Sequence, residues 1–141
     1  MEAIVLDASV GAKWLFDEDQ SDKARILFDF FNAGKIKVIV PEFFFVELAN
    51  VCCRKIKGKS SLFDSTMKGF DEICELPFEK YPDIELSGVA MDNAFIHKIS
   101  LYDAIYVSLA EIYLAPLITA DAALVKRVKS RFDFIELLKD R

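Results

Sequence analysis

Four acidic residues of this sequence stand within apolar segments, where carboxylates are uncommon: Asp7, Glu47, Asp103 and Asp121. Carboxylates that converge repel one another unless a cation lies between them, and oxygen ligands favour Mg²⁺ or Mn²⁺ over zinc or copper. A divalent cation held in this way can activate water and neutralise a phosphodiester. The four acids therefore indicate a hydrolytic metal site, provided that the fold brings them together.

Each acid also has an ordinary structural explanation. Asp7 could belong to a turn at the end of a strand. Asp103 and Asp121 could cap helices, each contributing about 1 kcal/mol. Glu47 is harder to explain in this way, because it is expected in the middle of a helix that is apolar around most of its circumference. A buried carboxylate without a partner costs several kcal/mol, so Glu47 calls for a cation from elsewhere.

Hydrophobic periodicity predicts the elements that must position these acids. Short β-branched runs predict strands at 3–6, 37–40, 117–119 and 134–137, with a further short strand at 77–79. Helical spacing predicts helices over 9–15, 21–34, 42–57, 60–75, 83–95, 101–114 and 121–129. Ser9 and Ser21 are expected to cap the first two of these helices.

Strands that alternate with helices predict a single domain over residues 1–141, built as a three-layer α/β/α sandwich around a mostly parallel sheet. Ligands of open α/β sheets bind outside the carboxyl ends of the strands. Asp7 and Asp121 lie at or just beyond two such ends. The predicted topology therefore places the chemistry at that edge of the sheet.

Composition narrows the class of protein. The chain has 141 residues, of which 53% are hydrophobic and 29% charged, and this excludes a disordered polypeptide. Its net charge of −5 argues against binding nucleic acid by bulk electrostatics, although bound cations can invert the local field. The sequence has no basic signal-peptide region and no long apolar stretch, and its three cysteines form no paired motif. We therefore expect a cytoplasmic protein with no membrane span and with buried, structural thiols.

Four segments resemble, in order, the motifs of PIN-domain proteins, and specifically of the VapC toxin branch. They are Val5-Leu6-Asp7-Ala8-Ser9-Val10, Pro41-Glu42 with Val46-Glu47-Leu48-Ala49-Asn50, Tyr102-Asp103-Ala104, and Leu117-Ile118-Thr119-Ala120-Asp121. A single motif of this kind is weakly specific, but four in order extend the resemblance over nearly the whole chain.

The resemblance implies a function and a site. Asp7, Glu47, Asp103 and Asp121 would form a catalytic quartet that binds Mg²⁺ or Mn²⁺, with Ser9, Asn50 and Thr119 as supporting residues. The implied activity is endonucleolytic cleavage of single-stranded RNA by a metal-activated water. The implied partners are a cognate antitoxin protein and a second copy of the chain in a homodimer.

Arg54, Lys55, Lys57 and Lys59 follow the Glu47 helix and have two interpretations. They could be a solvated helix terminus that the helix dipole favours, or they could bind RNA phosphates. The sequence leaves both open. Trp14 is expected in the core rather than as a base-stacking platform, and His97 in a loop or the core rather than on a metal.

Other functions fit the sequence less well. A phosphatase with an aspartate nucleophile would need a second Asp where Ser9 stands, and a phospho-receiver domain would need an acidic pair beside Asp7. Two alternatives share the predicted fold: an RNA-processing nuclease outside a toxin system, and an inactive interaction module. The complete set of four acids speaks against the inactive module.

Overall fold

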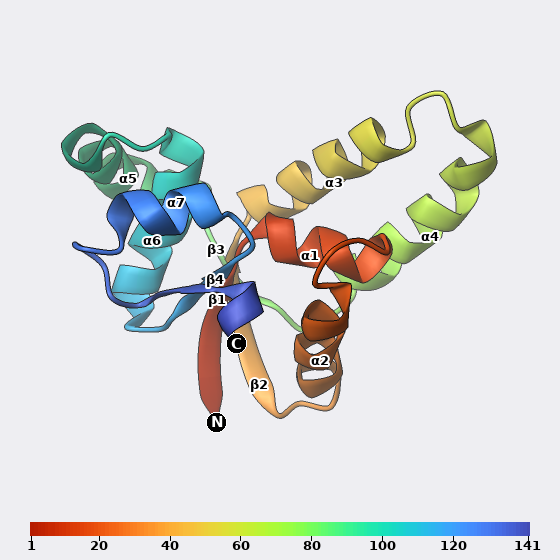
Figure 1. The fold of residues 1–141 in the computed structure, drawn as a ribbon, viewed down its shortest axis with the longest axis horizontal. Helices are drawn as coiled ribbons and strands as arrows, with labels where there is room; N and C mark the ends of the chain where they lie inside the picture. Colours follow the sequence, from red (N-terminus) through yellow and green to blue (C-terminus); the bar gives the residue numbers. More distant parts are fainter.

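A strand of aliphatic residues runs through the centre of the molecule, and Ile4, Val5 and Leu6 in it are completely buried. In the computed structural model, which describes residues 1–141, this strand belongs to a five-stranded sheet (Figure 1). The strands are β1 (Glu2–Leu6), β2 (Ile36–Pro41), β3 (Glu79–Tyr81), β4 (Leu117–Thr119) and β5 (Ile135–Leu137). All neighbouring strands pair in parallel.

Helices cover both faces of this sheet. They are α1 (Ala8–Leu15), α2 (Ser21–Asn32), α3 (Phe43–Lys55), α4 (Phe63–Cys74), α5 (Asp83–His97), α6 (Leu101–Tyr113) and α7 (Ala122–Val128), with 3₁₀ turns at Ser60–Leu62 and Leu138–Asp140. In Figure 1, α1 to α4 lie on one side of the sheet and α5 to α7 on the other. This arrangement confirms the predicted three-layer α/β/α sandwich with a parallel sheet.

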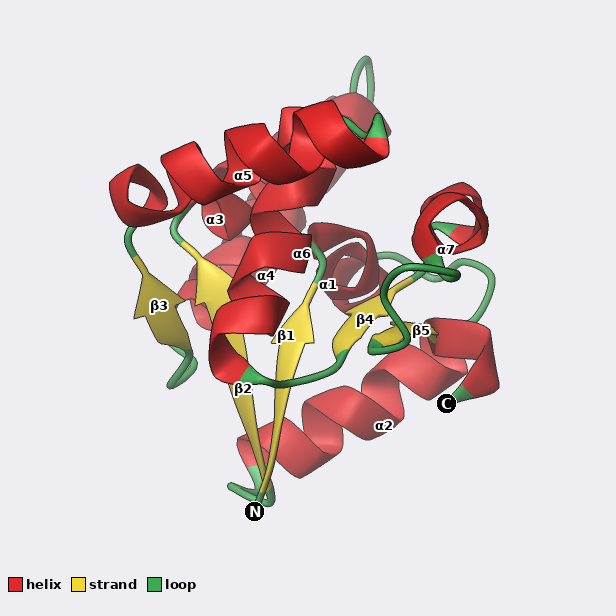
Figure 2. Ribbon diagram, turned by 90° about the vertical axis from the view of Figure 1, so that its left-hand side faces the viewer, coloured by secondary structure: helices red, strands yellow, loops and turns green.

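The strand order is β3-β2-β1-β4-β5, which places the middle of the chain and its end on opposite sides of β1. From β1 the chain winds outward through β2 to β3, and it then returns to add β4 and β5 on the other side (Figure 2). The winding direction therefore reverses between β1 and β4. Binding sites of open α/β sheets lie at such a reversal, outside the carboxyl ends of the strands.

Helices α3 and α4 extend beyond the sheet as an antiparallel arm, and the turn at 56–62 forms its tip (Figure 1). Close packing of α1 against α3 holds the base of this arm. A Cβ atom added at Gly11 would lie 2.9 Å from Cζ of Phe44, so glycine is needed for this approach. The packing positions the helix that carries Glu47.

Several boundaries differ from the predicted ones. The third strand lies at Glu79–Tyr81 rather than at 77–79, and the Glu47 helix ends at Lys55 rather than at residue 57. The predicted caps were wrong: Asp7 and Gln20 occupy the N-cap positions of α1 and α2. The Ser9 hydroxyl instead donates to Oδ2 of Asp7, and the Ser21 hydroxyl donates to the carbonyl of Phe16.

No helix combines the length and apolar character needed to cross a membrane. Of the three free cysteines, Cys52 is buried, whereas Cys74 is partly exposed and Cys53 is exposed. The expectation of buried thiols therefore holds for Cys52 alone.

Candidate functional site

Asp7 is the first residue of the site along the chain. It directly follows β1, at the carboxyl edge of the sheet. Its backbone N–H donates to the carbonyl of Ile118 at the end of β4. Its side-chain Oδ2 accepts hydrogen bonds from two hydroxyl groups, that of Ser9 at 2.8 Å and that of Thr119 at 2.7 Å. Two donors on one oxygen fix the orientation of this carboxylate.

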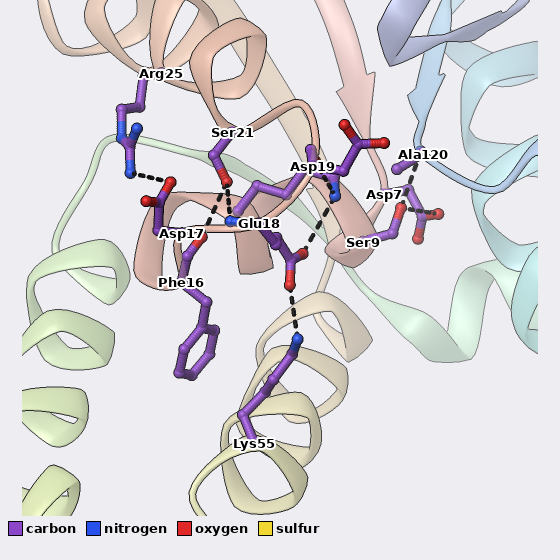
Figure 3. A network of polar contacts seen from close by, with 11 residues as sticks. Asp7, Ser9, Phe16, Asp17, Glu18, Asp19, Ser21, Arg25, Lys55 and Ala120 are labelled. Carbon is purple, nitrogen blue, oxygen red and sulfur yellow. Dashed lines mark hydrogen bonds and ion pairs between the residues drawn. The ribbon is translucent and has the colours of Figure 1, made fainter.

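The same hydroxyls tie β4 to the start of α1. Ser9 Oγ accepts the backbone N–H of Ala120 at 3.1 Å, and Figure 3 shows Ser9 between Asp7 and Ala120. Thr119 Oγ1 accepts the backbone N–H of Asp121 at 3.1 Å, so Thr119 links the first of the four candidate acids to the last. Both residues predicted to support the site on these segments thus contact its acids.

Asp121 is exposed and caps helix α7, and its Oδ1 accepts the N–H of Leu124 at 3.1 Å. The capping explanation is therefore correct for this residue. Capping is not the only effect of this side chain. One oxygen caps the helix, and the negative charge of Asp121 also acts on Asp7 and Asp103.

The capping explanation is wrong for Asp103, which lies inside the first turn of α6. The cap is Ser100, whose Oγ accepts the backbone N–H of Asp103 at 3.0 Å. Loss of hydration is the largest influence on the Asp103 carboxyl and raises its pKa, and the charges of Asp7 and Asp121 act in the same direction.

Glu47 extends from α3 towards α6, where the Tyr106 hydroxyl donates to its Oε1 at 2.8 Å. The side chain is half-buried, and α3 buries only one stripe of residues, so the expectation of a helix enclosed on nearly all sides was wrong. The pKa of Glu47 is raised to about 7, mainly by desolvation and further by the charges of Asp7 and Asp103. The Tyr106 hydrogen bond and the charge of Arg54 oppose the rise.

Asp7 shows the same balance. Desolvation raises its pKa, the hydrogen bonds from Thr119 and Ser9 lower it, and the charge of Asp121 raises it. Four acids that are far apart in the sequence thus share one electrostatic neighbourhood at the switch between β1 and β4. None of the ion pairs of the structure involves any of them.

The chemistry of this donor set fits a hard divalent cation, because its four carboxylates lack a paired base and those of Asp7, Glu47 and Asp103 are partly desolvated. The side chains are near enough to act on one another's charge. However, no three His, Cys, Asp or Glu side chains stand close enough together to hold a metal ion as they are placed. The fold therefore brings the four acids to one edge without gathering them into a coordination shell.

The remaining predicted residues lie on the arm. Asn50 is exposed, and it takes no part in the hydrogen bonds that engage Asp7 and Glu47. Lys55 donates to Glu18 at 2.7 Å (Figure 3). Glu18 also pairs with the largely buried Lys13 at 3.2 Å. This network tethers α3 to the loop after α1, so Lys55 already has an intramolecular partner.

The other three bases of that cluster, Arg54, Lys57 and Lys59, are exposed and make no ion pair. Arg54 acts electrostatically on Glu47. Arg127, in the last turn of α7, acts in the same way on Asp103 and is likewise exposed and unpaired. Two cations therefore flank the acids, one from each side of the sheet.

Sequence reasoning missed Arg127 and did not foresee the role of Tyr106. A signal for Tyr106 was present, since it stands three residues after Asp103 and so shares its face of the helix. Its partner Glu47 is 59 residues away, and no local pattern indicates that contact. Nothing in the sequence around Arg127 indicates a role in the site. Its position shows only that it lies near the end of the helix that follows Asp121.

Trp14 packs against the core, as expected. His97 is in neither a loop nor the core, because α5 continues past its predicted end at residue 95 and His97 is its last, partly exposed residue. The Trp14 indole N–H donates to the carbonyl of Ala24 at 2.8 Å, and its ring packs against Phe28 and Phe78. His97 lies against Phe132 and next to the Arg131 guanidinium.

Comparisons with known proteins agree with this architecture. The family model described as the PIN domain matches residues 4–130. The crystal structure of PAE2754 from Pyrobaculum aerophilum superposes with a TM-score of 0.71 at 18% identity, covering 99% of this chain and 85% of that one. VapBC2 from Rickettsia felis, bound to a DNA fragment from its promoter, gives 0.66 at 13% identity, covering 96% and 98%. No protein with curated function matches the sequence.

Proposed function

This chain belongs to the PIN domain family, and we propose that it is a metal-dependent endoribonuclease that cleaves single-stranded RNA. PIN domains are generally nucleases, so membership supports a hydrolase. The observation that carries the proposal is the meeting of four carboxylate charges at the switch between β1 and β4, with Asp7 oriented by Ser9 and Thr119. Residues 1–141 would form one nuclease domain.

Asp7, Glu47, Asp103 and Asp121 would hold Mg²⁺ or Mn²⁺. When bound, such a cation lowers the pKa of a water molecule and neutralises charge on the phosphodiester. The protein supplies orientation, because Ser9 and Thr119 hold one oxygen of Asp7 in place. The Tyr106 hydroxyl donates to Oε1 of Glu47 and so orients the second carboxylate.

The physiological setting follows from the sequence resemblance, and the fold supports it. The motifs resemble those of VapC toxins, and the chain shares its fold with VapBC2. We therefore extend the proposal to a cytoplasmic toxin, with a cognate antitoxin and a homodimeric state. An RNA-processing nuclease outside a toxin system is the second candidate. A small adjacent gene with a DNA-binding N-terminus would favour the toxin.

The test of activity uses the full chain with single-stranded RNA. Cleavage should require Mg²⁺ or Mn²⁺, stop in EDTA, and be abolished by Asp7→Asn and by Asp103→Asn with native circular dichroism. Asp29→Asn is the matched control, because Asp29 is an exposed acid on α2 and should be replaceable without effect. Undiminished cleavage by both site variants would refute the assignment, and an inactive wild type would favour the interaction module.

A further inference from the structure

An aromatic pair lies next to the contact between Glu47 and Tyr106. The rings of Phe43 and Tyr102 stack with their centroids 5.1 Å apart and their planes inclined by 13°. Phe43 precedes Glu47 by four residues on α3, and Tyr102 precedes Tyr106 by four residues on α6. Residues four apart occupy one face of a helix about one turn from each other. The stacked pair is therefore one turn away from the hydrogen bond at the acids.

The two rings differ in their surroundings. Phe43 is partly buried and packs against the core, and its backbone N–H donates to Oδ1 of Asp83 at 3.0 Å. Tyr102 is 57% exposed and stands directly before Asp103 in the first turn of α6. Phe43 thus packs against the tyrosine ring, and more than half of Tyr102 stays exposed to solvent next to Asp103.

The charges around this open ring suit a nucleic acid strand. Arg54 and Arg127 flank the acids from α3 and α7, and neither has an ion-pair partner in the protein. Unpaired nucleobases stack on exposed aromatic rings while nearby cations contact the phosphates. An apolar protein partner would match the ring but not the cations on either side of it.

We propose that Tyr102, supported by Phe43, is a stacking platform for one unpaired base of an RNA strand whose phosphate lies at the four acids. The inference rests on the proposed nuclease function and adds to it a residue that seats the substrate. Because every base has a π face, the platform would select unpaired over paired RNA without selecting a sequence.

The test measures binding of a fluorescein-labelled single-stranded RNA octamer by anisotropy in Mg²⁺, with Asp7→Asn as the background so that the RNA stays intact. Adding Tyr102→Leu should weaken binding about fivefold or more, whereas Tyr102→Phe should stay within about twofold. Octamers with a single abasic position should then be scanned. The loss caused by Tyr102→Leu should disappear for one abasic position and persist for the others.

Phe30→Leu is the matched control, since Phe30 is 45% exposed but lies on α2, away from the acids. It should bind RNA as the background does. Equal binding by the Tyr102→Leu and background proteins, or a loss that is the same for every abasic octamer, would overturn the platform. So would a change in molar mass by light scattering with unchanged RNA affinity, because that result would assign the ring to contact with a second copy.

Failure of the proposed nuclease function would give a different experimental result from failure of the platform alone. In that case the unaltered protein neither binds nor cleaves RNA in Mg²⁺, and the platform is refuted together with it. If the unaltered protein cleaves RNA while Tyr102→Leu leaves both binding and KM unchanged, the nuclease function stands and only the platform is wrong.

Discussion

The hydroxyl of Tyr106 on α6 donates a hydrogen bond to Oε1 of Glu47 on α3 at 2.8 Å. It joins helices from opposite faces of the sheet above the carboxyl ends of the strands. The contact orients a carboxylate that carries a pKa of about 7 and holds that pKa below the value that desolvation alone would produce. Glu47 is therefore sensitive to small changes in its surroundings near neutral pH.

Replacing Tyr106 by Phe removes the hydrogen bond and keeps the ring in its buried position. We expect the pKa of Glu47 to rise, because the lost donor favoured the ionised form. The acidic limb of the pH profile of kcat/KM for RNA should therefore move to higher pH, and unfolding should become easier by about 1 kcal/mol. An unchanged acidic limb would show that Glu47 does not need to be ionised in the reaction.

Glu47→Gln isolates the stability effect of the raised pKa. The folded-state pKa of about 7 exceeds the ordinary pKa of 4.5. The carboxyl group of Glu47 therefore stabilises the fold at pH values below 4.5. That contribution is lost as pH rises through about 7. In EDTA at pH 8 the variant should be more stable than wild type by about 1 kcal/mol, after allowance for solvent screening. Chemical unfolding at pH 4 and pH 8 should show the advantage only at the higher pH.

Asp103→Asn should behave in the same direction, since the pKa of Asp103 is raised by desolvation and by two neighbouring negative charges. In EDTA at about pH 7.5 the variant is expected to melt at a higher temperature than wild type. Added Mg²⁺ should reduce or reverse the difference, because it stabilises only the intact site by mass action. A variant that melts lower in EDTA, with neither protein responding to Mg²⁺, would make Asp103 a purely structural residue.

Thr119→Val replaces a completely buried hydroxyl by a methyl group of similar size. The change removes one of the two hydroxyl donors to Asp7 and the acceptor for the N–H of Asp121. We expect a loss of stability of roughly 1–3 kcal/mol and weaker binding of Mn²⁺ by calorimetry. Thr119→Ser keeps the hydroxyl and serves as the control, which should retain most of the metal affinity.

Charge reversal at Arg54 and Arg127 tests whether the flanking cations contact RNA. Arg54→Glu with Arg127→Glu should raise KM several-fold at low salt and flatten its salt dependence. Lys35→Glu makes the same kind of change on an exposed residue before β2, at the opposite edge of the sheet, and should alter neither quantity. If all three reversals have equal effects, net charge is responsible and no local contact is needed. Adding Lys57→Glu would show whether the cation path continues along the arm.

Much of the fold was predictable from local patterns. A strand of buried aliphatic residues ending at Asp7 is visible in the sequence because side chains of a fully buried strand are apolar on both faces. The alternation of strands and helices leads to a parallel sheet, since parallel strands need crossover connections. Glu47 was selected as a candidate site residue because it stands among apolar residues in the sequence. The structure shows, however, that α3 is far more exposed than its composition indicates.

The motif resemblance predicted the members of the site, but only the tertiary structure showed which of their side chains contact one another. The order β3-β2-β1-β4-β5 sets β4 beside β1 and thereby brings Thr119 to Asp7, across 112 residues of sequence. Strand order depends on how whole elements pack, and helical and strand periodicity does not encode it. Ser9 illustrates the same limit: the motif resemblance predicted a supporting role and its position suggested a helix cap, but only the packing shows that its hydroxyl links Asp7 to Ala120.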